Sequence, residues 1–306
     1  MSAGRTGAGA VINPPQERWL DVDGFRVHAV EWGDGEARIL LVHGLGGHTI
    51  NWEPVGPELA GRMHASVTAV DLPGFGLTRV PPGRHATMGT HGRLLRVLLE
   101  RSGPAVVIGN SMGGALGIGL AARHPDLMRA LVLVDPALPR PAGNPAQWAL
   151  MARLAPTIVP QVGSRLLAAR ARILGPERLV DQMAALTMCH PARLDPTLRR
   201  KLVDLARTRQ SFPEAPTAFA ESARALFSYL TRKMRADEAR VTAPTLIVHG
   251  DNDRLVPLAA ARALAARRPE FTLRVMDDCG HVPQLEVPDQ FLGAAMPWLA
   301  ATLAAR

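Results

Sequence analysis

The stretch AVVIGNSMGG (Ala105–Gly114) decides the fold. The apolar residues at its start predict a short strand that is buried on both faces. The residues that follow match the pattern G-x-S-x-G, with Ser111 between Gly109 and Gly113. A side chain at either glycine would collide with the neighbouring strand or helix, so the pattern is typical of a tight strand-to-helix turn. The stretch therefore predicts a strand, a sharp turn that presents a serine, and a helix.

Other parts of the chain repeat this alternation of buried strand and helix. Apolar runs predict strands at residues 38–44, 66–74, 130–136, 244–251 and 272–278. Helical spacing predicts helices at residues 90–103, 257–270 and 289–306, and we expect Pro297 to kink or split the last of these. The segment Trp19–Trp32 alternates in polarity around Asp23-Gly24, which predicts a hairpin. We therefore predict an α/β fold, with a mostly parallel, doubly wound sheet flanked by helices.

One long stretch, residues 138–240, departs from the alternation. It contains no convincing strand, its prolines recur, and several of its segments have the pattern of amphipathic helices. Because insertions are tolerated in surface connections, we interpret it as a helical cap inserted into the α/β core; a separate domain packed alongside is the alternative. The predicted organisation is a flexible tail at 1–17, a core at 18–137 and 241–306, and a cap at 138–240.

Composition limits the function classes. The chain has 306 residues, of which 47% are hydrophobic, enough for a large core. Its two cysteines form no CxxC pair and no disulfide framework, so we expect a reducing, cytoplasmic location. The net charge of +8 comes from scattered arginines and only 4% of residues are aromatic, which argues against a nucleic-acid partner. No apolar run has the length of a signal peptide or a transmembrane helix.

A serine hydroxyl needs a base to take its proton, and a histidine oriented by a carboxylate supplies one. Among the ten histidines, His281 is the candidate, because it follows Gly280 just beyond the last predicted strand. A loop at that point would return to the carboxyl edge of the sheet, where ligands bind in open α/β folds.

Several aspartates compete to orient this histidine. Asp253 follows a predicted strand end in HGDNDRLVP and lies between the serine and the histidine in the chain, so it is the predicted partner. Asp135, after another strand end, is the competitor, and Asp251 is expected to support the turn. Asp277 and Asp278 are too close in sequence to His281 to orient it easily. No cluster of histidines or cysteines completes a metal site, so we predict neither a metal nor a cofactor.

The developing oxyanion needs hydrogen-bond donors. The residue after the serine, Met112, offers its backbone N–H, and Leu45 in the glycine loop HGLGG (His43–Gly47) offers a second. We also expect Gly44 in the same loop, together with Asn110 and Val282 next to the reactive side chains, to line the substrate pocket.

Five segments together resemble the α/β-hydrolase superfamily: HGLGG, DLPGFG (Asp71–Gly76), GNSMGG, HGDNDRLVP and CGHVPQLEVP. The resemblance extends over nearly the whole chain. It implies that Ser111, Asp253 and His281 form a triad, that the N–H groups of Leu45 and Met112 form the oxyanion hole, and that the helical insertion is the family's cap.

The resemblance also implies a reaction, in which Ser111 is acylated and water activated through His281 releases the acyl group. A serine nucleophile excludes relatives that use aspartate, such as epoxide hydrolases and haloalkane dehalogenases. We expect first a carboxylesterase acting on an ester or thioester, because Val282 and Pro283 follow the histidine where C–C bond hydrolases of ring-cleavage pathways carry an aromatic residue. The serine turn GNSMGG, including Asn110, resembles that of the C–C bond hydrolases, which are therefore the alternative. A slow-turnover ligand receptor, or another non-hydrolytic member of the fold, is the alternative of a different class.

The predicted cap favours an apolar small-molecule substrate, because methionine adapts to irregular apolar ligands. Its arginines could meet lipid head groups, so peripheral membrane contact is a further expectation. The sequence does not indicate whether the protein is a monomer or an oligomer. The cap side chains behind the apolar expectation are Trp148, Met151, Met183, Met188, Phe227 and Met234.

Overall fold

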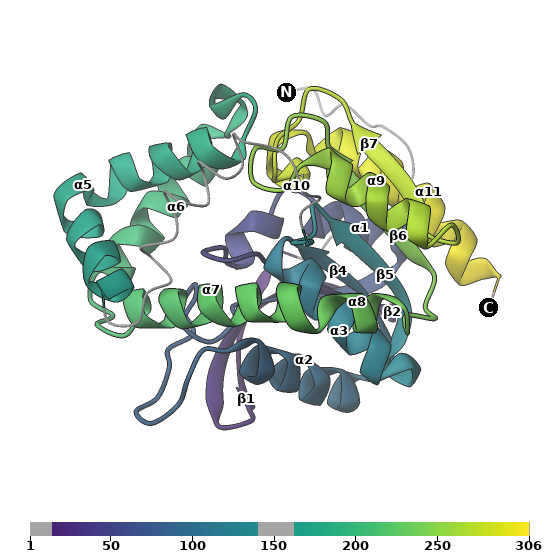
Figure 1. Ribbon diagram of the computed structural model, residues 1–306, viewed down its shortest axis with the longest axis horizontal. Coiled ribbons are helices and arrows are strands. Elements are labelled where there is room, and N and C mark those ends of the chain that lie inside the picture. The colour runs from purple at the N-terminus through teal and green to yellow at the C-terminus, as the bar shows by residue number, and fades with distance from the viewer. Residues whose placement is uncertain (1–13, 140–161, 306) are drawn as a thin grey trace, which may run out of the picture.

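The computed structural model describes residues 14–139 and 162–305 (Figure 1). Most of the predicted tail and the first part of the predicted cap, including Trp148 and Met151, lie outside these residues. The first strand begins at Gln16, two residues inside the predicted tail. No helix within the described ranges is long and apolar enough to cross a bilayer.

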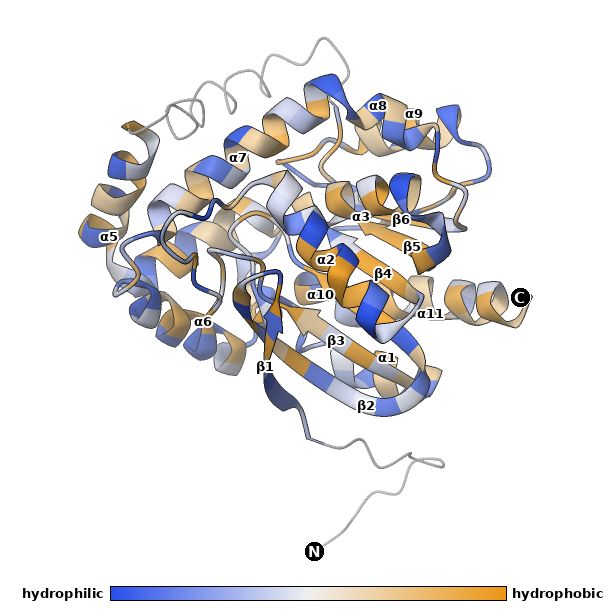
Figure 2. Cartoon of the chain, turned by 90° about the horizontal axis from the view of Figure 1, so that it is seen from below, coloured by the Kyte–Doolittle hydropathy of each residue, from blue (hydrophilic) through white to orange (hydrophobic). Residues whose placement is uncertain are grey.

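A seven-stranded sheet forms the centre of the molecule and confirms the predicted fold class. Its order is β1-β2-β4-β5-β6-β7, with β3 also paired to β2, and the pairs from β2/β4 to β6/β7 are parallel. The strands are β1 (Gln16–Val22), β2 (Phe25–Val42), β3 (Ala65–Val70), β4 (Ala105–Asn110), β5 (Met128–Val134), β6 (Thr245–Gly250) and β7 (Thr272–Met276). Figure 2 shows β4 and β5 as largely hydrophobic, as expected for strands covered on both faces.

The predicted hairpin is present, but the strand that follows is longer than expected. Asp23 and Gly24 take positive φ angles of 49° and 77° and join β1 to β2 in an antiparallel pair. β2 then pairs with β3 twice, over residues 29–32 in reversed order and over residues 38–42 in the same direction. Between the two halves, a Cβ at Gly35 would lie 1.9 Å from the His64 carbonyl oxygen, so only glycine permits this crossing.

Helices cover both faces of the sheet. One face packs against α2 (Met88–Ser102), α3 (Met112–Arg123), α8 (Met234–Glu238) and α9 (Leu258–Arg267). The other face packs against α1 (Gly56–Met63) and α11 (Pro288–Ala304). Helix α11 runs as one helix through Pro297, so this proline does not split it. The two buried clusters hold the sheet in place, and the loops with the predicted site residues lie at its carboxyl edge.

Between β5 and β6 the described residues form helices and short connections, without a strand. The longer ones are α5 (Val162–Thr187), α6 (Pro196–Arg209) and α7 (Ala215–Arg232); α5 is interrupted at Gly175, where φ is 69°. Figure 1 shows α5 and α6 to one side of the sheet, while α7 leads back to α8 on the core. The short 3₁₀ turns are η1 (Thr49–Trp52), η2 (Pro125–Leu127) and η3 (Pro191–Arg193), and α10 (Pro283–Glu286) precedes α11.

Candidate active site

The serine lies where the sequence predicts, at the turn between β4 and α3. Ser111 has φ 52° and ψ −113°, an unfavourable conformation for a residue with a side chain. Hydrogen bonds fix it: its N–H donates to the Val134 oxygen at 3.0 Å, and its carbonyl accepts from Ala115 at 3.1 Å and Ala137 at 2.9 Å. The strain is therefore imposed by the surrounding structure, as in other functional turns.

Glycines leave the backbone room to make this turn. A Cβ at Gly109 would lie 2.4 Å from the backbone of Gly113, and one at Gly113 would lie 2.1 Å from the Val42 oxygen. These are contacts with backbone atoms, which cannot move aside as a flexible side chain can. The structure thus gives the physical reason for the spacing G-x-S-x-G.

The glycine loop after β2 lies directly against the serine. A Cβ at Gly44 would be 2.9 Å from the Cβ of Ser111, and Gly47 donates to the Gly44 oxygen at 3.0 Å. His43 is buried behind the loop; its Nδ1 is 2.7 Å from the Gly44 oxygen and its Nε2 accepts from the Leu72 N–H at 3.0 Å. Burial lowers the pKa of His43, so its ring is neutral, and its two hydrogen bonds hold the loop in place.

The two predicted oxyanion donors occupy suitable places. Met112 is the first residue of α3, where helix N–H groups lack an intrahelical acceptor. Leu45 follows Gly44 in the loop beside Ser111. Neither N–H has an acceptor within residues 14–139 and 162–305. Their action on a substrate oxygen stays a prediction.

A short hydrogen bond joins the predicted base to the predicted acid. His281 Nδ1 lies 2.7 Å from Asp253 Oδ2, and both side chains are buried. The other oxygen of Asp253 accepts from the N–H groups of Leu255 at 2.7 Å and Val256 at 3.0 Å. Burial raises the pKa of Asp253, but the charge and hydrogen bond of His281 outweigh it and the net shift is downward. Asp253 is therefore an ionised, fixed partner for the imidazole.

The competing carboxylates take other roles. Asp135 is fully buried beside the pair, and its Oδ1 accepts from the Gly250 N–H at 3.0 Å. Burial, followed by the neighbouring Asp253 carboxylate, raises the pKa of Asp135 well above its usual value, which favours its uncharged form. Asp251 supports the turn by accepting from the Cys279 N–H at 3.2 Å. Asp278 is half exposed and pairs with His190 and Arg193.

Asn110 and Val282 lie close to the predicted reactive groups, and their place in the substrate pocket stays a prediction. Asn110 is buried, and its Nδ2 donates to the Val134 oxygen at 3.0 Å and the His281 oxygen at 3.1 Å. It thereby ties the serine strand to the histidine loop, defined here as residues 277–286. Val282 is buried in an apolar cluster with Met188 and Leu198, which lie between β5 and β6.

The sequence predicts a complete triad, whereas the structure joins only part of it by hydrogen bonds. The structure brings together the histidine and aspartate, the serine turn and the glycine loop. Within the described ranges, however, the Ser111 hydroxyl has no hydrogen-bond partner, so its contact with His281 stays a prediction.

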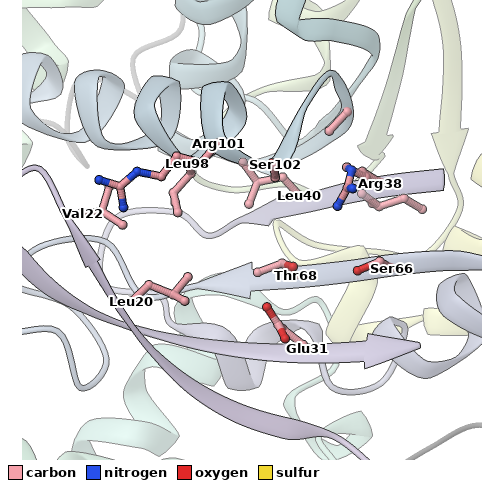
Figure 3. A pocket seen from close by; sticks show the side chains of 12 residues that line it. Leu20, Val22, Glu31, Arg38, Leu40, Ser66, Thr68, Leu98, Arg101 and Ser102 are labelled. Atoms are coloured by element: carbon pink, nitrogen blue, oxygen red, sulfur yellow. The ribbon is translucent and has the colours of Figure 1, made fainter. Parts of the chain in front are cut away.

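A cavity of about 240 Å³ lies elsewhere, near the start of β4, and contains none of the predicted site residues (Figure 3). Its walls include Leu20, Glu31, Arg38, Leu40, Thr68 and Arg101.

Two groups of described side chains have the spacing of metal ligands. In the first, Asp135, Asp253 and His281, the histidine nitrogen already faces the Asp253 carboxylate. In the second, Cys189, His190 and Asp278, the Arg193 guanidinium bonds Asp278 and would repel a cation. Neither arrangement favours a metal ion over the hydrogen bonds it already makes.

Two buried carboxylates near the site were missed by sequence reasoning. Asp71 begins DLPGFG and accepts from the N–H groups of Thr49 at 2.7 Å and Leu77 at 2.8 Å, while facing His28 Nδ1 at 2.7 Å. Burial pushes the pKa of Asp71 up, but the His28 hydrogen bond and nearby histidine charges bring it below its usual value. The signal for it was an acid directly after a buried strand.

The second missed carboxylate, Glu286, is buried five residues after His281. It accepts from three backbone N–H groups, those of Gly280 at 2.8 Å, Cys189 at 3.0 Å and His190 at 2.7 Å. Its only sequence signal was an acid between the apolar residues of CGHVPQLEVP, which identifies no partner.

Known proteins show clear similarity over most of the chain. A family described as "alpha/beta hydrolase fold" matches residues 37–288. The chain is 29% identical to a 2-hydroxymuconate semialdehyde hydrolase of Pseudomonas putida, over 94% of this chain and 98% of that protein. It is 31% identical to a pimeloyl-[acyl-carrier protein] methyl ester esterase of Aromatoleum aromaticum, over 82% of this chain and 93% of that protein.

Solved structures show the same fold. A 2-hydroxy-6-oxo-6-phenylhexa-2,4-dienoate hydrolase from Rhodococcus sp. strain RHA1 aligns with a TM-score of 0.73 and 24% identity, covering 95% of this chain and 99% of that one. A thermophilic esterase from Thermogutta terrifontis aligns with a TM-score of 0.69 and 26% identity, covering 94% and 99%. Both kinds of hydrolase expected from the sequence thus occur among the relatives.

Proposed function

Because the chain belongs to the α/β-hydrolase family, we propose that it is a serine hydrolase with Ser111, Asp253 and His281 as its catalytic triad. The observation that carries the proposal is the 2.7 Å hydrogen bond between His281 and the buried Asp253 carboxylate. The strained serine at the end of β4, two strands from β6, supports it. Together these groups have the residue types, the order along the chain and the common sheet edge that nucleophilic catalysis requires.

The proposed reaction has two halves. Ser111 Oγ attacks a substrate carbonyl carbon while His281 takes the hydroxyl proton through Nε2, and Asp253 stabilises the imidazolium that forms. The N–H groups of Leu45 and Met112 stabilise the oxyanion. His281 then gives the proton to the leaving group, which departs from the acyl-enzyme. Water, deprotonated by His281, attacks the acyl carbon and restores the serine hydroxyl with release of a carboxylic acid.

For the substrate, we propose a C–C bond of the kind found in ring-cleavage products, a 2-hydroxy-6-oxo-dienoate. Support comes from several relatives named as hydrolases of such compounds, which align over most of this chain, and from Asn110 in the serine turn. This order reverses the expectation from sequence, in which esters came first. With such a substrate, the 2-hydroxydienoate first tautomerises to its 2-keto form, which adds a proton to the carbon next to the scissile bond. The leaving group then departs as a carbanion delocalised as a dienolate, and the proton from His281 ends on the dienolate oxygen.

An ester or thioester is the second candidate. It is supported by the relative named as a methyl ester esterase and by Val282 and Pro283 after the histidine. The acyl half of the reaction is unchanged, but the leaving group is an alkoxide or thiolate, which is protonated on oxygen or sulfur.

The remaining proposals concern the cap, the kind of ligand, the cellular location and membrane contact. We propose residues 138–240 as a cap that covers the serine, with an apolar small molecule as ligand. The exposed cap side chains Met183 and Phe227, at 38% and 48%, support this, whereas Met188 and Met234 are buried in packing. A cytoplasmic location is supported by the two free cysteines. Peripheral membrane contact has no support beyond the cap's arginines.

One parallel assay tests the function. The protein and Ser111→Ala are incubated with a 2-hydroxy-6-oxo-dienoate, followed by loss of its absorbance, and with p-nitrophenyl esters of increasing chain length. We expect turnover of the dienoate to exceed that of every ester, and both to be lost in Ser111→Ala. Faster ester turnover would favour the second candidate. A few cycles with retained product would support a receptor, and turnover that survives in Ser111→Ala would exclude the mechanism.

A further inference from the structure

The cap is bonded to the backbone of the predicted catalytic histidine. The His281 N–H donates to the Thr187 oxygen at the end of α5, at 2.6 Å. The His281 carbonyl accepts from Asn110 Nδ2, at 3.1 Å, beside the serine. Both backbone polar groups of His281 therefore have partners outside the histidine loop, one in the cap and one in the serine strand.

Glu286 adds further hydrogen bonds between the histidine loop and the cap. One of its oxygens accepts from the N–H groups of both Gly280 and Cys189, and the other accepts from His190. The side chain is fully buried, and its nearest positive group is the Arg193 guanidinium at 3.8 Å. A buried carboxylate is costly unless hydrogen bonds satisfy it, so the three N–H groups are held in place by the same charge that they stabilise.

The two segments are also in direct backbone contact. A Cβ at Gly280 would lie 2.5 Å from the Thr187 oxygen and 2.7 Å from the Cys189 nitrogen. Beside this contact, Met188 and Ala184 of the cap pack in one buried cluster with Val282 and Leu285. The histidine loop and the cap segment Thr187–His190 are therefore packed directly against each other.

We propose that Glu286 is a positioning residue for His281, which it holds against Asp253 by fastening the cap segment Thr187–His190 to the histidine loop. This inference rests on the proposed function, because it assigns His281 to catalysis. A base displaced by about 1 Å from its working geometry costs on the order of 100-fold in rate. Since Glu286 contacts the loop and the cap but is not placed at the reacting atoms, its loss should lower kcat and leave KM nearly unchanged.

Glu286→Gln tests the proposal with minimal change in shape. The amide replaces one acceptor oxygen with an NH₂ group, which would face an N–H donor. We expect kcat for the hydrolysed substrate to fall about 100-fold, with KM within about 2-fold of the native value. Phosphonylation of Ser111 by a fluorophosphonate should slow to a similar extent, and the low-field proton resonance of His281 Nδ1–H should shift or broaden. Glu286→Asp, which keeps the charge, should recover part of the loss.

Glu53→Gln is the matched control. Glu53 also joins the core to the cap, through Lys201 Nζ at 2.5 Å, but it bonds no part of the histidine loop. We expect its kcat, labelling rate and proton resonance to equal those of the native protein. A similar loss in both variants would mean that any weakened cap contact lowers activity, and would overturn the specific role of Glu286.

Gly280→Ala provides a second route to the same displacement without altering a charge. Its new methyl group would force the Thr187 oxygen away, whereas Gly293→Ala on α11 adds a methyl group with nothing within 4 Å. We expect Gly280→Ala to lower kcat and the labelling rate about as much as Glu286→Gln, and Gly293→Ala to change neither. If Glu286→Gln fails to fold, this pair decides the question.

The outcomes separate the two proposals. No labelling of Ser111 in the native protein would contradict the serine-hydrolase function itself. Normal labelling and turnover in the native protein, together with unchanged kcat, labelling and proton resonance in folded Glu286→Gln or Gly280→Ala, would overturn the positioning role alone.

Discussion

The serine turn and the histidine loop meet at one edge of the sheet, but different forces hold them. Ser111 is set by sterics inside the core, where Gly109 and Gly113 leave space for backbone atoms only. The strand before it is buried along its whole length, and the helix after it is nearly as buried. Its conformation therefore depends on residues within a few positions in the chain and on the strands beside them.

The histidine loop, by contrast, is set by hydrogen bonds to a segment far away in sequence. It follows β7, an edge strand that is only partly buried. Its fixed points are Asp253, Asn110, Glu286 and Thr187 at the end of α5. The contrast teaches that the proposed nucleophile is fixed within the core, whereas the backbone of its proposed base is bonded to Thr187, in the helical segment between β5 and β6.

The largest effect is expected from removing the nucleophile. In Ser111→Ala, kcat should fall by about 10⁴-fold or more, because neither Asp253 nor His281 can replace the lost oxygen. The fold should persist, since alanine is smaller than serine. Steady-state assay and a thermal melt check this, with Ser102→Ala at the exposed end of α2 as the control. A loss of less than about 10-fold would contradict the triad.

Next in size is the contrast between the two buried aspartates. Asp253→Asn should lower kcat about 10⁴-fold, because an amide can hold the wrong imidazole tautomer. Burial and then the Asp253 carboxylate raise the pKa of Asp135, which favours its uncharged form, and the amide in Asp135→Asn is also uncharged. Its kcat should stay within about 5-fold of native, a change of about 1 kcal/mol in the barrier.

The kinetic comparison of these two variants distinguishes the candidates for the triad acid. Equal losses would mean that the acid is shared between Asp135 and Asp253. A larger loss in Asp135→Asn would reverse the assignment made from the His281 hydrogen bond.

The sterics of the serine turn predict a stability effect of intermediate size. Gly113→Ala places a methyl group against the Val42 oxygen and should lower the free energy of unfolding by about 3 kcal/mol. Gly293→Ala, in an open part of α11, should leave stability unchanged or raise it by up to about 1 kcal/mol. Urea denaturation measures both. Equal stability of the two variants would remove the steric explanation of the turn.

The smallest effect concerns a contact between α2 and α7, remote from the histidine loop. His91 on α2 is buried, with its Nε2 3.0 Å from Ser222 Oγ on α7, and burial lowers its pKa to about 3. The folded protein keeps this ring neutral, while the unfolded chain binds a proton below the ordinary value of 6.5. Stability is thus complete above pH 6.5 and falls as the pH decreases towards 3, by about 1.4 kcal/mol per pH unit for this group.

His91→Asn should remove this contribution to the pH dependence and leave kcat unchanged at neutral pH. The free energy of unfolding, measured by urea between pH 7 and pH 5, should decline less steeply than in the native protein. His64→Asn, at the exposed end of α1, is the control and should keep the native slope. A fall in kcat in His91→Asn would show that contacts of the helices between β5 and β6 support catalysis in general, and not only at the histidine loop.

The sequence predicts those parts of the molecule that depend on local chemistry. The serine turn, the hairpin at Asp23-Gly24 and the buried strands follow from glycine placement and apolar runs, and the structure confirms them. Asp253 was distinguished from Asp135 by its place in the chain, and the hydrogen bond to His281 agrees with that choice.

Features that depend on distant partners could not be predicted. The crossing of β2 beside β3 is set by backbone contact at Gly35, which hydrophobic periodicity does not record. The hydrogen bond from the Asn110 amide to the His281 carbonyl joins segments about 170 positions apart. Glu286 accepts from N–H groups about 100 positions earlier in the chain as well as from nearby Gly280. A backbone N–H is present at almost every position, so no residue type marks such partners.

The central claim, that Ser111 is the nucleophile and His281 its base, is tested most directly by active-site labelling. The native protein is treated with a fluorophosphonate, digested, and analysed by mass spectrometry, beside Ser111→Ala and His281→Ala. The account predicts one adduct, on the peptide that contains Ser111, formed at least about 100-fold more slowly in His281→Ala and absent in Ser111→Ala. An adduct on another residue, or equal labelling of the native protein and His281→Ala, would contradict it.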